Sequence, residues 1–388
     1  MSVFDLSTSA GYATSGAQNL RYTEINPESA NLSGQIRWRW QSSSNHYWIP
    51  CQTYMILNFQ VTKAGGVPIE TGDNVSLAKD TGACAWNLVT HQINGVNCGV
   101  SNNPGVDSIV MKRAFMSSEF RNSVGDIFNL TDSQTLAFAG DYAQHAFVPP
   151  LGLYDTKTGI PGGSHLLTAS LATNLVERMI SGGRTTAGLT ITLQKARLMV
   201  CHVQPNEIMD IPKTVFVNTI DLQTSSMNHN SNGSTSLVYS VPPSSRKLFV
   251  SSQLSNLGSS NAKGATFLGG CLMSSLFVDY AGHQSPTAIY ADELTDYKRK
   301  YFDLYAEKIM SGASAYDTLN QHKLQPLTLH AFNKSESDTS TTATLKMTAD
   351  GSTSPSLIYM SALHHNSIVL QYSPGSGLLE TVNFVSAL

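Results

Sequence analysis

Short stretches in which apolar and polar residues alternate recur along most of this chain, with turn-forming residues between them. The clearest covers residues 53–61, where one face carries Thr53, Met55, Leu57, Phe59 and Val61 and the other carries Tyr54, Ile56, Asn58 and Gln60. A period of two places one face of a β-strand on a hydrophobic core, so we expect Phe59 to be buried. Many short strands with few helices between them predict an all-β sandwich or barrel.

Other stretches share this alternation or are rich in β-branched residues. They cover residues 36–40, 85–93, 135–138, 165–171 and 189–203 in the first half, and 237–241, 246–254, 272–279, 327–332, 341–347, 357–362 and 368–372 in the second. We expect Phe249 to face inward in the same way as Phe59.

The order of these features repeats. Asn94-Gly95 is a strong hairpin signal after a strand, and a helix is predicted at residues 107–121. In the second half Ala281-Gly282 closes a strand, and a helix is predicted at residues 292–310. Gly95 and Gly282 are 187 positions apart (282 minus 95), about half of the 388 residues. This predicts a duplicated architecture, although the halves cannot be aligned residue by residue.

The length of the chain exceeds what one hydrophobic core usually organises, so we expect two sandwiches. We assign residues 34–204 to the first and residues 214–388 to the second, with a linker at 205–213. Residues 1–33 are rich in small and polar residues without periodicity, and we expect an extended N-terminal arm there.

Composition favours self-association. Charged residues make up 13% of the chain, about half of the ~25% usual for a soluble domain. Uncharged polar groups cost less to bury than ions, and interface cores are depleted of charge. Aromatic residues, at 9%, supply the burial that a disordered chain lacks. The first 36 residues hold one basic residue, Arg21, so we expect no sequence-specific nucleic-acid binding.

The five cysteines form no CxxC pair, and we expect buried reduced thiols. The amino-terminal residues lack a charged-then-apolar leader, and no apolar run approaches the ~20 residues of a membrane span. We therefore expect the protein to be made in a reducing compartment.

Several polar residues are candidates for chemical sites, and each has a simpler structural interpretation. They are the adjacent His364 and His365, the isolated His145, the acids at positions 292, 293 and 296 at a helix start, and the loop acids Asp73 and Asp80 as calcium ligands. We predict no catalytic, cofactor-binding or metal-binding residue and no enzymatic activity. A glycan-cleaving site would need two converging carboxylates, which no feature indicates.

The densest aromatic cluster is Trp38, Trp40, Tyr47 and Trp48. One interpretation is a sugar-stacking platform, which would make the chain a carbohydrate-binding β-sandwich of a lectin-like or viral attachment type. The other is the rim of a sandwich core or a seam between subunits, favoured by the alternation of the tryptophans with arginines.

Three stretches resemble the double jelly-roll major capsid proteins of tailless icosahedral viruses. Residues 91–96 (HQINGV), followed by 106–110 (VDSIV), are similar to the strand, turn and helix of the family's first domain. Residues 241–250 (VPPSSRKLFV) resemble the strand that opens the second domain. Residues 277–286 (FVDYAGHQSP), with the aromatic-rich 297–305, resemble its strand, turn and helix.

The resemblance implies two tandem eight-stranded jelly-roll sandwiches, each with a short helix. It also implies a homotrimer that forms a pseudo-hexameric capsomer and packs into an icosahedral shell. Minor capsid or penton proteins would be further partners, and an inner membrane lies under the shell of some members. The protein would belong to the virion, and the family has no catalytic residues.

Overall fold

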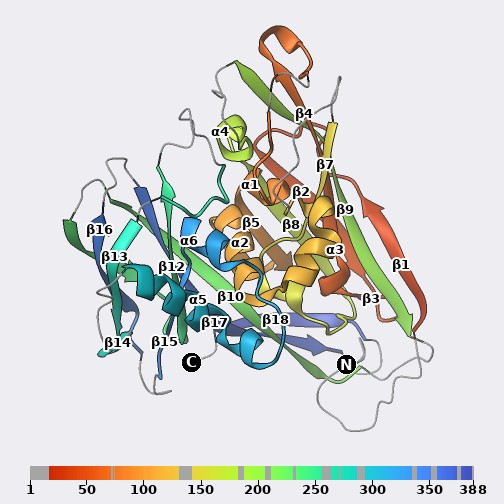
Figure 1. Cartoon of the computed structure of the whole chain (residues 1–388). Coiled ribbons are helices and arrows are strands. Elements are labelled where there is room, and N and C mark those ends of the chain that lie inside the picture. The colour runs from red at the N-terminus through yellow and green to blue at the C-terminus, as the bar shows by residue number, and fades with distance from the viewer. Residues whose placement is uncertain are drawn as a thin grey trace.

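The computed structural model describes most of the chain as two β-sandwiches that lie side by side, with helices between them (Figure 1). The described residues are 17–70, 73, 75–130, 142–181, 188–205, 211–229, 233–255, 264–270, 272–285, 293–333, 339–350, 356–373 and 377–386. The predicted strand at 135–138, residues 1–16 of the predicted arm and 206–210 of the predicted linker lie outside these ranges.

The first sandwich consists of two antiparallel sheets. Its strands are β1 (Ala17–Ile25), β2 (Gln35–Ser42), β3 (Tyr47–Trp48), β4 (Tyr54–Lys63), β5 (Trp86–Ile93), β6 (Val96–Ser101), β7 (Tyr142–Phe147), β8 (Gly163–Leu171) and β9 (Leu189–Pro205). One sheet has the order β1-β9-β4-β7, with β3 also paired to β9, and the other has the order β2-β8-β5-β6.

The second sandwich repeats this plan. Its strands are β10 (Thr214–His229), β11 (Gly233–Ser240), β12 (Lys247–Leu254), β13 (Leu272–Tyr280), β14 (His283–Ser285), β15 (Thr328–Ala331), β16 (Thr342–Asp350), β17 (Ser356–Tyr372) and β18 (Leu379–Ser386). The sheets have the orders β10-β17-β12-β15, with β18 paired to β17, and β11-β16-β13-β14.

Both sandwiches have one strand order. With β3 and β18 set aside, each sandwich pairs its first, eighth, third and sixth strands in one sheet and its second, seventh, fourth and fifth in the other. The fourth and fifth strands are joined by the hairpins at Asn94-Gly95 and Ala281-Gly282, whose residues all have positive φ. Such turns match the twist of the flanking strands. The predicted duplication and the eight-stranded rolls are confirmed.

Among the described residues, three helices are longer than two turns, and the other helical segments are short. The helices are α1 (Thr81–Cys84), α2 (Pro104–Phe115), α3 (Ser118–Phe128), α4 (Leu175–Met179), α5 (Glu293–Met310) and α6 (Leu319–Leu324), and the 3-10 turns are η1 (Pro50–Gln52), η2 (Ala64–Gly66) and η4 (Gly152–Asp155). The single helix predicted at 107–121 is two helices, α2 and α3, because Met116 is extended. The helix predicted at 292–310 is confirmed by α5.

Part of the predicted arm is a strand. β1 pairs antiparallel with β9 from Ala17 to Ile25, so these nine residues of the predicted arm form the first strand of the first roll. β1 forms the edge of its sheet, and Leu20 and Tyr22 are exposed. An edge strand with no fully buried face lacks the alternation by which the other strands were predicted. The remaining domain boundaries stay predictions.

The strands predicted at 357–362 and 368–372 are one strand, β17. β10 pairs with its whole length, whereas its other edge is shared between β12 and β18. Met360 packs in the second core and Leu370, on the same face of β17, packs in the first. This long strand therefore contributes to the cores of both sandwiches.

Each sandwich has its own core, and a third apolar cluster joins them. Phe59 is fully buried in the first core, as predicted. Phe249 is also buried, but it lies in the third cluster, where Val106, Ile109 and Val110 of α2 meet residues of the second half. Within the described residues, no helix is both long and apolar enough to cross a bilayer.

Candidate functional site

Of the four residues of the densest aromatic cluster, Trp38, Trp40 and Trp48 lie inside the first core, and Tyr47 packs beside it with Ile49, Cys201 and Val203. Trp38, Trp48 and Tyr47 are fully buried, and Trp40 is 5% exposed. The Trp40 and Trp48 rings meet edge to face at 5.4 Å between centroids. A platform for a sugar needs an accessible ring face, so the carbohydrate-binding alternative at these residues is wrong. Their alternation with arginines on β2 was the correct signal, because it places the rings on the inward face.

Two histidines form a hydrogen-bonded pair between these rings. His91 Nε2 lies 3.4 Å from His165 Nδ1. At the outer ends of the pair, His91 Nδ1 is 3.0 Å from the Tyr154 hydroxyl and His165 Nε2 is 2.9 Å from Ser42 Oγ. Burial lowers the pKa of His91 to about 3 and that of His165 well below its usual value. The pair is therefore uncharged at neutral pH.

The 3-10 turn η4 joins this pair to the second sandwich. Its Tyr154 reaches His91, and its Gly152 N–H donates to Asp221 Oδ1 on β10 at 2.7 Å. The other Asp221 oxygen accepts from Thr219 Oγ1 and Asn366 Nδ2, each at 2.8 Å. A buried carboxylate with three donors is a well-satisfied anchor. η4 therefore holds the two sandwiches together through β10.

Helix α2 makes a second connection between the sandwiches. Arg113 is 3% exposed, and its Nε donates to Asp317 Oδ2 at 2.6 Å while its Nη2 donates to the Gln325 carbonyl at 2.6 Å. The Tyr305 hydroxyl also donates to Asp317 Oδ2, at 3.0 Å. Because both charges are buried, removing either one would leave the other uncompensated.

The neighbouring Lys112 is buried as well. Its Nζ lies 2.6 Å from Asp80 Oδ2 and 2.8 Å from Ser108 Oγ, and Asp80 itself is fully buried. A loop acid that was weighed as a calcium ligand is therefore the partner of a lysine. Asp73, the other such acid, pairs with Lys63 at 2.9 Å.

The carboxyl group of Asp107, also on α2, has two hydroxyl groups as its hydrogen-bond partners among the described residues. Ser101 Oγ and Thr224 Oγ1 each lie 2.5 Å from its carboxyl oxygens, and Thr224 belongs to the second sandwich. Burial raises the pKa of Asp107 to about 7, against the lowering effect of these hydrogen bonds. This carboxyl is thus another link between the two halves.

Two adjoining cavities lie on the surface, and we call them together the junction groove. The described residues that line the first belong to the first roll, whereas Asn218 and Ile220 of the second roll help to line the second. The two cavities have volumes of about 370 and 310 Å³ and share Met111, Met116 and Asp155. The remaining lining residues are Tyr22, Cys51, Gln52, Thr53, Tyr54, Ser108, Lys112, Phe120, Phe128, Val148, Pro149, Pro150 and Tyr154 in the first cavity, and Phe115, Gly152, Thr156, Asn218 and Ile220 in the second.

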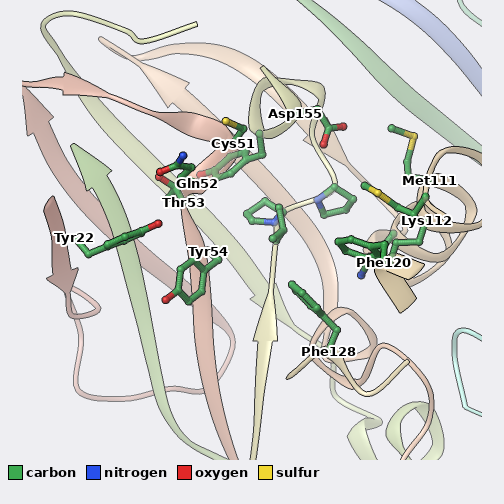
Figure 2. A pocket seen from close by; sticks show the side chains of 16 residues that line it. Tyr22, Cys51, Gln52, Thr53, Tyr54, Met111, Lys112, Phe120, Phe128 and Asp155 are labelled. Carbon is green, nitrogen blue, oxygen red and sulfur yellow. The ribbon is translucent and has the colours of Figure 1, made fainter. Parts of the chain in front are cut away.

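The junction groove is mostly apolar. Figure 2 shows Tyr22 and Tyr54 on strands at one side and Met111 and Phe120 on helices at the other. Asp155 lines both cavities and is an exposed residue. The groove continues into large apolar side chains that face solvent: Tyr22, Phe115 and Ile220 are 43%, 43% and 42% exposed. Such a patch marks an interaction surface.

The histidines that the sequence offers as candidate sites, His145, His364 and His365, are not among the residues that line the junction groove. On β17, His364 is half-buried and His365 is exposed, so they face opposite sides as predicted. His145 on β7 is buried, which lowers its pKa to about 4. Among the described residues, no group of three or more His, Cys, Asp or Glu side chains is placed to hold a metal ion.

Sequence reasoning did not identify the buried charged residues of α2, the connection that η4 makes, or the histidine pair. One signal was present for α2, since residues 104–115 carry apolar side chains around most of the circumference of the helix. Such a helix is enclosed on every side, and its Lys112 and Arg113 then need buried partners. η4 and the histidine pair have no comparable local signal.

Comparison with known proteins supports the fold. No family model matches the chain, and no curated protein matches it. A cryo-EM structure of the Sputnik virophage matches with a TM-score of 0.70 and 11% identity, over 98% of this chain and 91% of that one. The mavirus major capsid protein matches with a TM-score of 0.57 and 11% identity, over 98% and 94% of the two chains.

The Faustovirus major capsid protein matches with a TM-score of 0.58 and 7% identity, over 98% of this chain and 92% of that one. This chain has the double jelly-roll fold of these major capsid proteins. Nearly the whole of each chain is covered, so the likeness includes both rolls and their relative placement. The likeness therefore establishes the double jelly-roll fold of this chain.

Proposed function

We propose that this double jelly-roll chain is a major capsid protein. In this proposal it forms homotrimers, each a pseudo-hexameric capsomer, and the capsomers pack into an icosahedral viral shell. The observation that carries the proposal is the identical strand order of the two rolls within one chain. Three copies of such a chain supply six similar rolls, which is what a tile with near-sixfold symmetry requires.

A tile must also keep its two rolls in one fixed relation. We call the contact between the two rolls the seam. It meets this requirement through the hydrogen bond from η4 to Asp221 and the ion pair of Arg113 with Asp317, and these charged side chains are buried. The apolar cluster between α2 and the second half covers the rest of the contact. Breaking the seam would expose apolar surface and buried charge together, which opposes rotation of one roll against the other.

The junction groove supports self-association. Its exposed aromatic and aliphatic side chains, with Phe216 50% exposed on the same face of β10 as Ile220, form the kind of surface that subunit contacts cover. The low charged fraction of the chain lowers the cost of burying the surrounding surface. We place a subunit contact of the trimer at this groove.

The rest of the proposal concerns location and partners. The protein would be made inside the host cell and reside in the virion, with minor capsid or penton proteins as neighbours and, in one form of such shells, a membrane beneath. It would act through assembly and carry no enzymatic activity.

The test is the mass of the purified chain in solution, followed by electron microscopy. We expect a particle of about three times the 41.9 kDa chain mass, with a pseudo-hexagonal outline, and closed shells or sheets at high concentration. A chain that stays monomeric at high concentration, with no ordered assembly on the grid, would overturn the proposal.

A further inference from the structure

We propose that the His91–His165 pair is a proton-sensitive latch that holds η4 in place and thereby controls the junction groove and the seam. The inference deepens the proposed function, since it names a regulation of the surface at which that proposal places a subunit contact.

Tyr154 connects the histidine pair to η4. The His91 Nδ1 to Tyr154 hydroxyl contact of 3.0 Å ties the pair to the middle of η4, and Trp48 lies flat on the His91 ring at 5.0 Å between centroids. Trp40 lies flat on the His165 ring in the same way, at 5.1 Å. The aromatic rings and Tyr154 thus enclose both imidazoles.

Residues of η4 in turn form part of the wall of the junction groove. Tyr154 lines the first cavity, and Gly152 and Asp155 line the second, so three of the four residues of η4 form groove wall. Gly152 also supplies the N–H that Asp221 of the second sandwich accepts. Any displacement of η4 therefore changes the groove and removes a hydrogen bond of the seam.

Protons change the hydrogen bonding and the charge of the pair. With both imidazoles neutral, one N–H lies between them and serves the other ring. Full protonation puts an N–H on both facing nitrogens, 3.4 Å apart, and places two charges in the core. His202 on β9 acts electrostatically on His165, and His46 and Arg21 act in the same way on His202. Each of these groups is positively charged when it is protonated.

The pair therefore meets repulsion, and no acidic side chain among the described residues is hydrogen-bonded to it. Opening of η4 gives both imidazoles access to water and to protons. The equilibrium constant for opening of η4 then rises about tenfold for each histidine with every pH unit that the pH falls below ~6.5, or roughly 100-fold per unit for the pair. Acid favours the open form because the closed form binds protons more weakly.

The experiment is hydrogen exchange measured by mass spectrometry on the full chain, between pH 7.5 and 5. The reporters are the amides of Gly152, Tyr154 and Thr156, which donate to Asp221, Leu151 and Leu153. The protection factors of these amides, corrected for the intrinsic pH dependence of exchange, should fall about 100-fold per pH unit below pH 6. At every pH at which η4 exchanges, the amides of β16 in the second core should stay protected.

Two variants, His91→Gln and His165→Gln, should each reduce the slope to about tenfold per pH unit, since one titrating group is left. The matched control His365→Gln changes an exposed histidine and should leave the slope as in the natural chain. If neither core variant folds, the natural chain still decides, because loss confined to η4 supports the latch and uniform loss overturns it. A slope that both variants leave unchanged also overturns it.

The mass of the assembly, measured on the same samples, separates the two proposals. A trimer at pH 7.5 that dissociates at pH 5 in the natural chain and the control, and less in the two variants, supports both. A monomer at both pH values with the expected η4 slope overturns the capsid proposal and leaves the latch standing. A trimer with a flat η4 slope overturns the latch alone.

Discussion

Gly152 of η4 packs directly on the backbone of Ile220 in β10. A Cβ built on Gly152 would lie 2.4 Å from the Ile220 carbonyl oxygen and 2.7 Å from its carbonyl carbon. Both neighbours are backbone atoms of a long paired strand, so they cannot move aside as a flexible side chain can. The first and second rolls approach each other closely here because residue 152 has no side chain.

Gly152→Ala should therefore destabilise the protein by about 1–3 kcal/mol through overpacking at the seam. The measurement is the free energy of unfolding from denaturant titration. Gly105→Ala is the matched control, because its nearest neighbour would be 3.7 Å away and it lies in a helix, where alanine is favoured. Equal effects of the two substitutions would contradict the close contact.

Lys112→Met should cost about 3–5 kcal/mol, because it leaves the buried carboxylate of Asp80 without its cation. Lys247→Met provides the comparison, since Lys247 pairs with the mostly exposed Glu307 at the surface and should contribute less than about 1 kcal/mol. Thermal unfolding of both variants measures the difference. A small loss for Lys112→Met would show that Asp80 reaches water or another donor.

Ile220→Arg should prevent trimer formation while leaving the fold intact. Ile220 is 42% exposed and lines the junction groove, so a charge there is tolerated in the free chain but is costly to bury in a subunit contact. Val238→Arg, at a residue 51% exposed on β11, is the control. Light scattering gives the mass and circular dichroism checks the fold. A trimer that survives Ile220→Arg would move the contact elsewhere.

Buried histidines should make the protein less stable in acid. His330 is fully buried, its Nδ1 is 2.7 Å from the Ser285 carbonyl oxygen, and burial lowers its pKa to about 4. Its unfolded pKa is about 6.5, so the unfolded chain binds more protons between pH 6.5 and 4. The unfolding free energy should therefore fall by about 3 kcal/mol across that window because of this residue.

His330→Asn should remove this part of the pH dependence, and it is measured by denaturant titration at several pH values. His365→Gln is again the control, because His365 is exposed. An unchanged slope in His330→Asn would mean that His330 stays accessible to protons in the folded protein.

Most strands were predictable because their signal is local. Met55, Leu57, Phe59 and Val61 alternate within β4, and one buried face requires that pattern whatever the strand pairs with. Asn94-Gly95 predicts a hairpin because the turn needs positive φ at both positions. The second hairpin at Ala281-Gly282 follows from the same backbone requirement.

The edges and the long strands were harder to predict. β1 has an exposed face, and β17 changes its neighbour from β12 to β18 halfway along its length. The histidines at 364 and 365 interrupt the apolar pattern at that change, so one strand was interpreted as two. The partners of a strand are residues that lie far away in the sequence, so a short stretch of sequence does not reveal them.

The amino-acid sequence alone determined the twofold repeat of strands, hairpins and helices, because each depends on residues within about ten positions of one another. Only the tertiary structure decided that Trp40 and Trp48 enclose His91 and His165, that Lys112 and Arg113 are buried, and that Gly152 contacts Ile220. These contacts join segments distant along the chain, and their energies depend on burial, which exists only once the two rolls have packed together.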